Sequence, residues 1–526
     1  MKNRILSWVL LAVLCLTLAP LSALATDAEL PAYSEITVEV FDRGNVGGTD
    51  PTNNYYTDWI KAKVLEELNI GVTFVAVSRG EENVQLNNLM AAGTAPDICF
   101  TYSGDLITNY ANQGGIVDLT PYIEAGLLTN LTAFLGPDLA KPGSDFIYRN
   151  KNVESGATWS VPARRLNNAS CNTFIRKDWL DALGLAIPTT TEEFVNVLRE
   201  FKEKDPGGVG ADKIVPFTMT RDVRWRASTL IESFIDPSLT DKDRWINTVA
   251  DRRFLLPGYK EGVRLVNQLY NEGLIDPEFP LYVDDTGSDN LIKSGVVGAF
   301  IHNWDQPYRA TPGLLNDLLV NVPGAEIVAI NPFQDAAGNT PKSLYDAAGV
   351  QFFVPVFSQN PEGAVRYADW LSKFENRYYL QTGDEGVTHV MDNGVPRLIT
   401  VEGEKIMNSG QNIDYTFMIN GLDTGDNATY MQALAGSYAV DAQLIVDAFT
   451  YAMQDGRPPV IVPGVEIVSA GPVNETLVQK GETLLAQAIT AKPEDFDAVW
   501  DEGIADWLAS GAQEVIDERA AKYVAP

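Results

Sequence analysis

Several aromatic and polar side chains follow predicted strands, where they could hold a small polar ligand. Asn303, Trp304 and Asp305 come directly after an apolar strand, and Tyr102 and Ser103 follow another one. Flat aromatic faces stack on the apolar faces of pyranose rings, while carboxylates and amides form hydrogen bonds with ring hydroxyls. These five residues therefore predict a carbohydrate site, although Trp304 could also be a tryptophan buried in its loop.

Arginine side chains could supply forked donors to the same kind of ligand. Arg164 and Arg165 are adjacent, so they could bind ligand oxygens or brace the chain through carboxylates. Trp225 lies in a charged run at 221–226, which could line a binding face or form a solvated surface. The complete set of candidate ligand-binding residues is Asn54, Tyr56, Tyr102, Ser103, Arg164, Arg165, Trp225, Asn303, Trp304 and Asp305.

The sequence is poor in the residues that metal sites and nucleophilic centres need. Its two histidines, His302 and His389, are far apart, which leaves little for a histidine metal site or a Ser-His-Asp centre. The Asp284-Asp285 pair does not match EF-hand spacing. No nucleophile-elbow, zinc-protease or P-loop motif occurs. We therefore expect no catalytic residue, no metal and no cofactor.

The elements that would position the first candidates alternate between strand and helix. The pattern predicts a strand over 36–41, a glycine-rich loop over 42–54, a helix over 59–68, a strand over 72–77, a helix over 82–92 and a strand over 97–101. This order predicts a parallel sheet covered by helices, with ligands beyond the carboxyl ends of its strands. Asn54 and Tyr56 join the candidate set because they end the loop after the first strand.

A second α/β run starts near Thr173. Thr190 and Glu193 predict a capping box at the start of a helix. Further elements are predicted as a helix over 259–273, a helix over 290–295, a strand over 296–301, a strand over 351–356, a helix over 361–374 and a long amphipathic helix from Pro493 to the end.

The first residues and the overall charge indicate where the protein is found. Two early basic residues, an apolar run over 6–18 and Ala23-Leu24-Ala25 predict a signal peptide at 1–25, cleaved before Thr26. Cys15 follows Leu14 within the apolar run, which argues against a lipid-anchored cysteine. We expect an exported protein, periplasmic or extracellular. The formal charge of −31 makes nucleic acid an improbable partner.

Two cysteines, Cys99 and Cys171, follow the predicted signal peptide. A bridge between them and two buried free thiols both remain open.

Short motifs in series resemble the family 1 extracellular solute-binding proteins of ABC importers. They are AAGTAPDI at 91–98, QGGIVDLT at 113–120, FIRKDWL at 174–180, LGL at 183–185, PTT at 188–190, LYNEGLID at 269–276, KSGVVGA at 293–299, GDEG at 383–386 and DNG at 392–394. The resemblance spans about residues 36 to 400.

The resemblance implies an α/β fold of the type II periplasmic-binding-protein class, with two lobes that close on a ligand like a Venus flytrap. Each lobe is expected to be a mainly parallel sheet flanked by helices, with passages between lobes near 163–172 and 348–353. The implied lobes are 26–168 with about 349–390, and about 169–348 with about 391–526, the latter carrying a C-terminal helical segment.

The resemblance also implies a small neutral ligand, an oligosaccharide by family habit. The expected partners are that ligand and the permease subunits of an ABC transporter, and the expected state is a monomer.

Three functional classes remain open. The first is a binding protein for import, without chemical turnover. The second is a secreted glycoside hydrolase or lyase, because 70 carboxylates could supply a catalytic pair. The third is a sensor that presents its bound ligand to a receptor kinase, which shares the fold of the first.

Overall fold

The structure is a computed structural model that describes most of the chain. The described residues are 30–42, 50–138, 140, 141, 143–309, 313–399, 403, 405, 414–425, 427–462 and 464–523. The predicted signal peptide and most of the loop over 42–54 lie outside them. Among the described residues, no helix is both long and apolar enough to cross a membrane.

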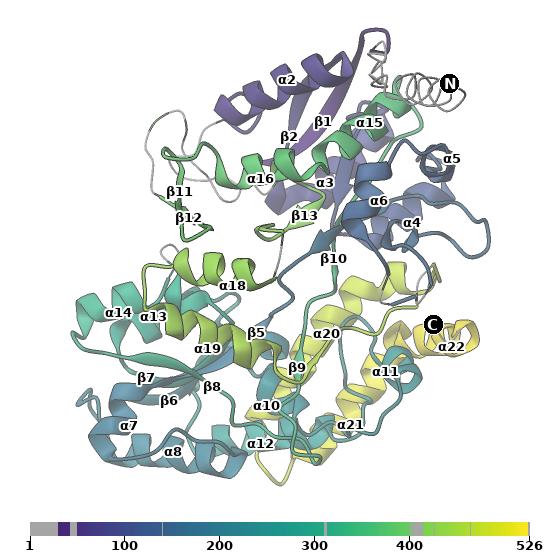
Figure 1. Ribbon diagram of the computed structural model, residues 1–526. Coiled ribbons are helices and arrows are strands. Elements are labelled where there is room, and N and C mark those ends of the chain that lie inside the picture. Colours follow the sequence, from purple (N-terminus) through teal and green to yellow (C-terminus); the bar gives the residue numbers. More distant parts are fainter. Residues whose placement is uncertain are drawn as a thin grey trace, which may run out of the picture.

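The first lobe, at the top of Figure 1, contains two sheets. Strands β1 (Ser34–Asp42) and β2 (Ile70–Ser78) pair in parallel. The second sheet has the order β13-β4-β10-β3, with the bounds β13 (Ile419–Asn420), β4 (Val161–Arg165), β10 (Ala348–Phe353) and β3 (Cys99–Thr101). A parallel bridge between Val38 and Ile98 joins the two sheets.

Helices cover the sheets of this lobe. They are α2 (Tyr55–Leu68), α3 (Glu82–Ala92), α4 (Gly104–Asn112), α5 (Thr120–Glu124), α6 (Thr129–Leu135), α15 (Pro361–Leu371) and α16 (Phe374–Thr382), with short turns η1 (Arg79–Glu81) and η2 (Phe146–Tyr148) and a hairpin of β11 (His389–Asp392) and β12 (Val395–Leu398). Tyr415, Phe417 and Met418 pack in the core of this lobe. The first lobe therefore extends beyond the boundary at about 390 that the resemblance implied, because the chain forms β13 in this lobe before it passes to the second lobe.

The second lobe, below the first in Figure 1, contains one sheet of order β6-β7-β5-β8. Its strands are β6 (Val215–Thr218), β7 (Val297–Asn303), β5 (Cys171–Arg176) and β8 (Ile327–Ile330). Around it lie α7 (Lys177–Leu183), α8 (Thr191–Lys204), α9 (Val223–Arg226), α10 (Ser228–Glu232), α11 (Asp241–Asn247), α12 (Tyr259–Asn271), α13 (Thr286–Ser294), α14 (Leu315–Asn321), α18 (Asn427–Gly436) and α19 (Ala442–Met453), with η3 (Phe279–Leu281) and η4 (Gln306–Tyr308).

Both larger sheets are mixed rather than mainly parallel. Strand β10 is antiparallel to β3 and β4, and β5 is antiparallel to β7 and β8, whereas β1–β2, β6–β7 and β4–β13 are parallel. The antiparallel pairs of these two sheets all involve β10 or β5, which directly follow passages between the lobes. Strand β10 enters the first lobe from the second, and β5 enters the second lobe from the first.

The chain passes between the lobes more than once. The first passage lies at 166–170, between β4 and β5, and the return passage lies at 344–347, between β9 (Lys342–Ser343) and β10. A third passage leads from β13 to α18.

A later stretch, described over 458–462 and 464–469 and called the strap, contacts both lobes. In it Gly464 accepts a hydrogen bond from Val153 N of the first lobe at 3.2 Å. The strap follows β14 (Gly456–Arg457), which pairs with β9, and leads into α20 (Ala470–Thr490) on the second lobe.

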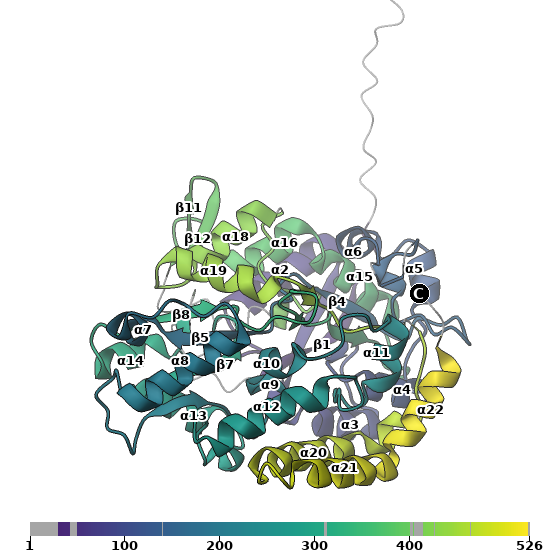
Figure 2. The same ribbon diagram turned by 90° about the horizontal axis from the view of Figure 1, so that it is seen from below.

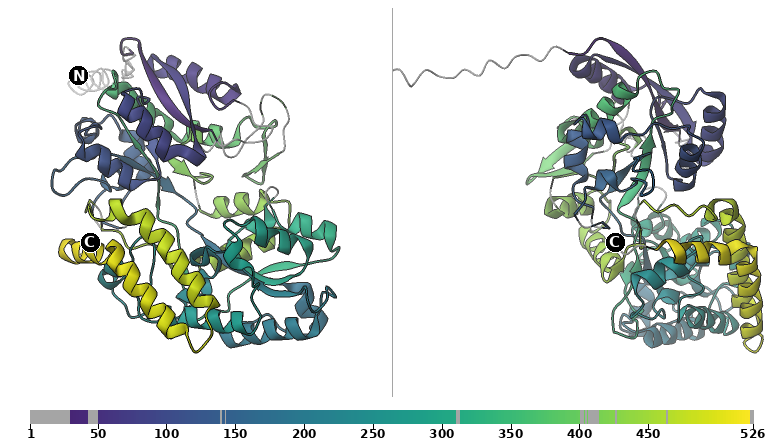
Figure 3. Two further views of the ribbon diagram at one scale, coloured as in Figure 1. Left: turned by 180° about the vertical axis from the view of Figure 1, so that it is seen from behind. Right: turned by 90° about the vertical axis from the view of Figure 1, so that its right-hand side faces the viewer.

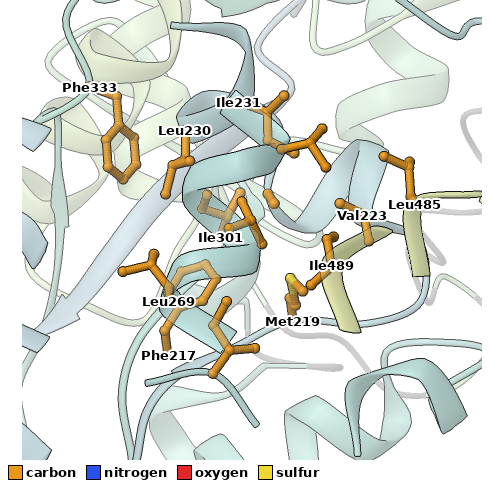
Figure 4. Close-up of a cluster of buried hydrophobic side chains, with 14 of the residues drawn as sticks. Phe217, Met219, Val223, Leu230, Ile231, Leu269, Ile301, Phe333, Leu485 and Ile489 are labelled. Atoms are coloured by element: carbon orange, nitrogen blue, oxygen red, sulfur yellow. The ribbon is translucent and has the colours of Figure 1, made fainter. Parts of the chain in front are cut away.

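The C-terminal helices enlarge the core of the second lobe. Figure 4 shows Leu485 and Ile489 of α20 beside Val223 and Met219 of that core. Helix α20 packs on α12 and on α21 (Phe496–Trp507), and the C-terminal helices lie along one flank of the lobe (Figures 2 and 3).

The predicted long helix from Pro493 is broken. It consists of α21, a π turn η5 (Leu508–Ala512) and α22 (Gln513–Lys522). The break lies at Gly511, whose φ of 118° is outside the helical region.

Several other predicted elements are confirmed. Helix α3 has the predicted bounds, and α8 begins with the predicted capping box of Thr190 and Glu193. The apolar face of α8 is buried, including Phe194 and Phe201, because side chains at helical spacing share one face.

Candidate ligand-binding cleft

Five adjoining cavities, three of which are lined by residues of both lobes, form one hollow, which we call the interlobe cleft. Their volumes are about 650, 300, 690, 340 and 270 Å³. Neighbouring cavities share lining residues, since Arg519 and Asp251 each line three of them. The first lobe contributes Asp105 and Arg164 to the lining, and the second lobe contributes Trp225.

Aromatic rings and guanidinium groups alternate along one side of the cleft. The Cζ atom of Arg165 lies 4.7 Å from the ring centroid of Tyr345, which is 5.6 Å from the ring centroid of Trp225. Arg224 lies over Trp225, with its Cζ atom 4.5 Å from the ring centroid. Tyr345 is fixed to the first passage, because its backbone N–H donates to Asn168 O at 2.9 Å. The set therefore joins both passages to the second lobe.

An amide and hydroxyl network lines the first-lobe wall. The Nδ2 atom of Asn150 donates to Gln351 Oε1 at 2.7 Å, and Ser160 Oγ donates to the same oxygen at 2.8 Å. These bonds orient the Gln351 amide, whose Nε2 donor has no protein acceptor among the described residues. Half-buried Trp159 lines the same cavity. This wall thus combines an oriented amide with an aromatic ring, two kinds of group that line small-molecule sites.

Charged groups of the second-lobe wall are mostly paired. Asp251 forms ion pairs with Arg224 and with Arg253, the latter at 3.5 Å. Glu232 pairs with Arg253 at 3.2 Å and accepts a hydrogen bond from Ser343 Oγ at 2.5 Å. The two carboxylates thus accept hydrogen bonds or ion pairs from Arg224, Arg253 and Ser343.

Asp105 and Arg519 line the same two cavities from opposite lobes. Burial raises the pKa of Asp105 and lowers the pKa of Arg519. The Nη1 group of Arg519 donates to Trp245 O at 2.7 Å and to Thr248 O, and its Cζ lies 5.3 Å from the centroid of the Trp245 ring. Neither side chain forms an ion pair with a described residue.

Three of the residues singled out from the sequence belong to this region. Trp225 and Arg164 line cavities of the cleft, and Arg165 stacks on Tyr345, which lines one. Their neighbours differ: Arg164 lines the cavity between the segment 137–149, α11 and the return passage. Arg165 and Trp225 belong to the aromatic set.

The structure places Trp304 in a core instead of on the cleft. Its side chain is 4% exposed, and its ring packs edge-on against Phe449 and Tyr438. Asp305 is buried in an ion pair with Arg309 at 2.6 Å. Helices α18 and α19 cover the end of β7 and convert the predicted ligand loop into core.

Asn303 instead supports a neighbouring charge. Its Oδ1 accepts a hydrogen bond from Arg226 at 3.2 Å, and that arginine forms an ion pair with Asp285.

Four further candidates serve local structure. Ser103 caps α4 and Asn54 caps α2 with their side-chain oxygens, a role for which both residue types are preferred. Tyr102 is 37% exposed and stacks under Arg79 at 4.6 Å, and Tyr56 is buried in the first lobe. None of the four lines one of the five cavities.

Sequence reasoning missed most of the cleft. Tyr345, Trp159, Trp245, Gln351 and Arg519 precede or lie far from the carboxyl ends of predicted strands. Of these residues, Tyr345 alone had a sequence signal for the cleft: it lies just before the passage between the lobes that was implied near 348–353.

The described residues include no cluster of histidine, cysteine or carboxylate side chains that could hold a metal ion. Cys99 and Cys171 are both buried free thiols, one in each lobe. Of the two possibilities left open by the sequence, the structure has the unpaired one.

Comparison with known proteins adds a family and a fold. The family model of bacterial extracellular solute-binding proteins matches residues 50–376. A fructooligosaccharide ABC transporter substrate-binding protein of Streptococcus pneumoniae, FusA, is 35% identical over 43% of this chain and 38% of its own length. A polygalacturonan/rhamnogalacturonan-binding protein of Bacillus subtilis, YtcQ, is 30% identical over 45% of each chain. These alignments therefore span less than half of either relative.

The fold is shared over a longer range. The crystal structure of the Streptococcus pneumoniae FusA protein in complex with kestose has a TM-score of 0.65 at 17% identity, covering 93% of this chain and 98% of that one. The two-lobed type II periplasmic-binding-protein fold expected from the sequence is thereby confirmed.

Proposed function

Because the chain belongs to the family of bacterial extracellular solute-binding proteins, we propose that it captures an oligosaccharide outside the cytoplasm and delivers it to an ABC-type importer. The relatives' names point to oligosaccharides and polysaccharide fragments: one relative is named for fructooligosaccharides and the other for polygalacturonan and rhamnogalacturonan.

The observation that carries the proposal is the aromatic set in the interlobe cleft. Trp225 and Tyr345 present ring faces beside guanidinium groups, and Gln351 presents an oriented amide donor on the opposite wall. A sugar ring would stack on the aromatic faces while its hydroxyls bond to amide and charged groups. Because the cleft is large and extended, it fits several linked sugar rings better than one.

Capture requires that the lobes move, and the passages are the natural hinge. The segments at 166–170 and 344–347 are short and adjacent, tied by the hydrogen bond between Tyr345 N and Asn168 O. A ligand that contacts both lobes stabilises the closed form by its differential affinity for the two states. The closed form would then be the one recognised by the importer's membrane subunits.

The paired carboxylates of the second-lobe wall favour binding over hydrolysis. A glycosidase needs one carboxyl as a proton donor and a second as base or nucleophile. Asp251 and Glu232 instead form ion pairs with Arg224 and Arg253. We therefore propose that the bound sugar leaves unchanged.

The proposal extends to location and assembly. An exported monomer, periplasmic or at the cell surface, would meet its ligand before import. A sensor that presents the loaded form to a receptor kinase would use the same cleft; loss of sugar uptake in a strain that lacks this protein separates import from sensing.

The test is a ligand screen by thermal unfolding followed by titration calorimetry. A ligand that binds only the folded state raises the unfolding temperature with concentration. We expect at least one oligosaccharide class to bind saturably, with no new reducing ends after long incubation. Failure of every oligosaccharide, or steady release of reducing ends, would overturn the proposal.

A further inference from the structure

The largest cavity of the cleft, about 690 Å³, is enclosed by both lobes and by both passages. Its walls come from Phe146 and Arg164 of the first lobe, Arg244 of the second, Asp346 of the return passage and the stretch 456–461. We call it the Arg164 cavity. A ligand in it would touch every part that moves when the lobes close.

Four arginines line the Arg164 cavity, and they fall into two kinds. Arg149 pairs with Asp346 at 2.8 Å, and Arg457 pairs with Asp335 at 3.1 Å. Arg164 and Arg244 form no ion pair with any described residue. The chain has a formal charge of −31 and 70 carboxylates. Two arginines of one cavity that lack a carboxylate partner are therefore unusual here and suggest that the partner is a ligand.

Backbone carbonyls hold these two side chains in place. Arg164 donates from Nη1 to Leu135 O, and its guanidinium lies over the Phe146 ring with Cζ at 5.5 Å from the centroid. Arg244 donates from Nη2 to Asp236 O at 3.0 Å and from Nε to Leu239 O at 3.4 Å. The remaining donors, Nε and Nη2 of Arg164 and Nη1 of Arg244, have no protein acceptor among the described residues.

Nearby carboxylates do not compensate the two charges. Burial lowers the pKa of Arg164 although Asp138 is close, and burial together with Arg457 lowers the pKa of Arg244 although Asp241, Glu232 and Asp236 are close. Burial is thus the largest influence on both guanidinium groups, and an anion in the cavity would offset it.

Three acids line the Arg164 cavity, namely Asp138, Asp241 and Asp346. Asp346 is paired with Arg149. Asp138 is buried; its Oδ1 accepts from Ala140 N at 2.9 Å, and its Oδ2 has no hydrogen-bond partner among the described residues. Asp241 is exposed in the first turn of α11, and neither acid forms an ion pair with Arg164 or Arg244. The free donors of Arg164 and Arg244 thus remain available to an incoming anion.

We propose that Arg164 and Arg244 bind the carboxylate of an acidic oligosaccharide, with one arginine from each lobe. This inference rests on the proposed function and names its ligand class as carboxylate-bearing sugars of the uronic acid type, in place of the neutral ligand expected from the sequence. Arginine forks match carboxylate geometry, so the two arginines select for charge as well as position. Because they stand on opposite lobes, the bound carboxylate also draws the lobes together.

The test compares acidic and neutral ligands by titration calorimetry on the full mature chain. The probes are trigalacturonate, a neutral trisaccharide of glucose, and sialyllactose as a carboxylate on a different sugar. We expect a carboxylate-bearing probe to bind at least about tenfold more tightly than the neutral one. Rising salt should weaken binding of the acidic probe and leave binding of a neutral one unchanged.

Variants assign the effect to the two arginines. Arg164→Gln and Arg244→Gln should each weaken binding of the acidic probe by about tenfold or more, whereas binding of a neutral probe should change little. Arg164→Lys and Arg244→Lys keep the charge and should restore part of the affinity. Arg199→Gln is the matched control, because Arg199 lies on α8 in an exposed pair with Glu272. Thermal unfolding of each variant verifies that it folds.

Tight binding of the neutral probe with no gain from a carboxylate, or acidic binding that survives both glutamine substitutions in folded protein, would overturn this inference and leave the proposed function standing. If no oligosaccharide of either kind binds, the proposed function itself fails. The two carboxylate probes distinguish uronate from sialate as the source of the charge.

Discussion

The ring of Trp225 on the second lobe lies 5.6 Å, centroid to centroid, from the ring of Tyr345 on the return passage. One of these residues belongs to a lobe and the other to the segment that links the lobes. Any movement of the second lobe about the passages therefore changes the relation between the two rings. A ligand stacked on Trp225 would sense that movement directly.

Replacing Trp225 with alanine should weaken oligosaccharide binding. Loss of one stacked ring costs about 1 to 3 kcal/mol, which raises Kd by about 5- to 150-fold. Titration calorimetry with the ligand found by screening measures this change. Trp225→Phe keeps a ring and should retain part of the affinity; an alanine variant that binds as tightly as the wild type would remove Trp225 from the site.

Replacing Trp304 with alanine should affect stability and leave the cleft intact. The side chain is packed against Phe449 and Tyr438, so its removal leaves a cavity that costs about 3 to 5 kcal/mol. Urea unfolding measures the loss, and calorimetry at low temperature measures Kd on the folded fraction. A stable variant with lost binding would instead return Trp304 to the ligand site.

The two tryptophans show which parts of this protein the sequence predicts. Helical spacing and the capping box of Thr190 are local signals, and α8 forms where they indicate. The end of β7 also looked like a ligand loop, but residues from α18 and α19, more than 120 positions later in the chain, cover it. No local pattern near Trp304 contains that information.

The cleft itself depends on contacts between distant segments. Tyr345 contacts Asn168 on the other passage and Arg165 at the end of β4, and both contacts fix its place. Arg519 reaches the cleft only because the C-terminal helices fold back on the second lobe. Arg164, Arg165 and Trp225 were found because they lie near a passage or in a dense polar and aromatic run, two features that are visible in the sequence.

Stability should depend on pH through Lys342. Burial lowers the pKa of Lys342 to about 7, and its ammonium group donates to Asn331 Oδ1 and Thr340 O without a carboxylate partner. Between pH 7 and about 10 the unfolded chain binds this proton and the folded chain does not, so the free energy of unfolding should rise with pH in that window.

Urea unfolding at pH 7, 8 and 9 measures the slope, and Lys342→Met should flatten it. Lys480 supplies the control: its side chain is 37% exposed and pairs with Asp506 on the surface, so Lys480→Met should leave the slope unchanged. An identical pH dependence for the wild type and Lys342→Met would show that this lysine titrates normally.

Gly511 should not tolerate a side chain. Its φ is 118°, and an added Cβ would lie 2.7 Å from Val473 Cγ1, so Gly511→Ala should reduce the free energy of unfolding by about 1 kcal/mol or more. Gly80→Ala is the matched control, because nothing lies within 4 Å of a Cβ at that position. Equal unfolding midpoints for the two variants would mean that the bend between α21 and α22 accommodates alanine.

The most direct measurement is small-angle X-ray scattering of the mature protein with and without a saturating oligosaccharide. We expect the radius of gyration to fall on ligand addition, because the lobes close over the cleft at Trp225 and Tyr345, and we expect the Trp225→Ala variant to need more ligand for the same change. A radius of gyration that stays constant while calorimetry shows full occupancy would contradict closure of the lobes around the sugar.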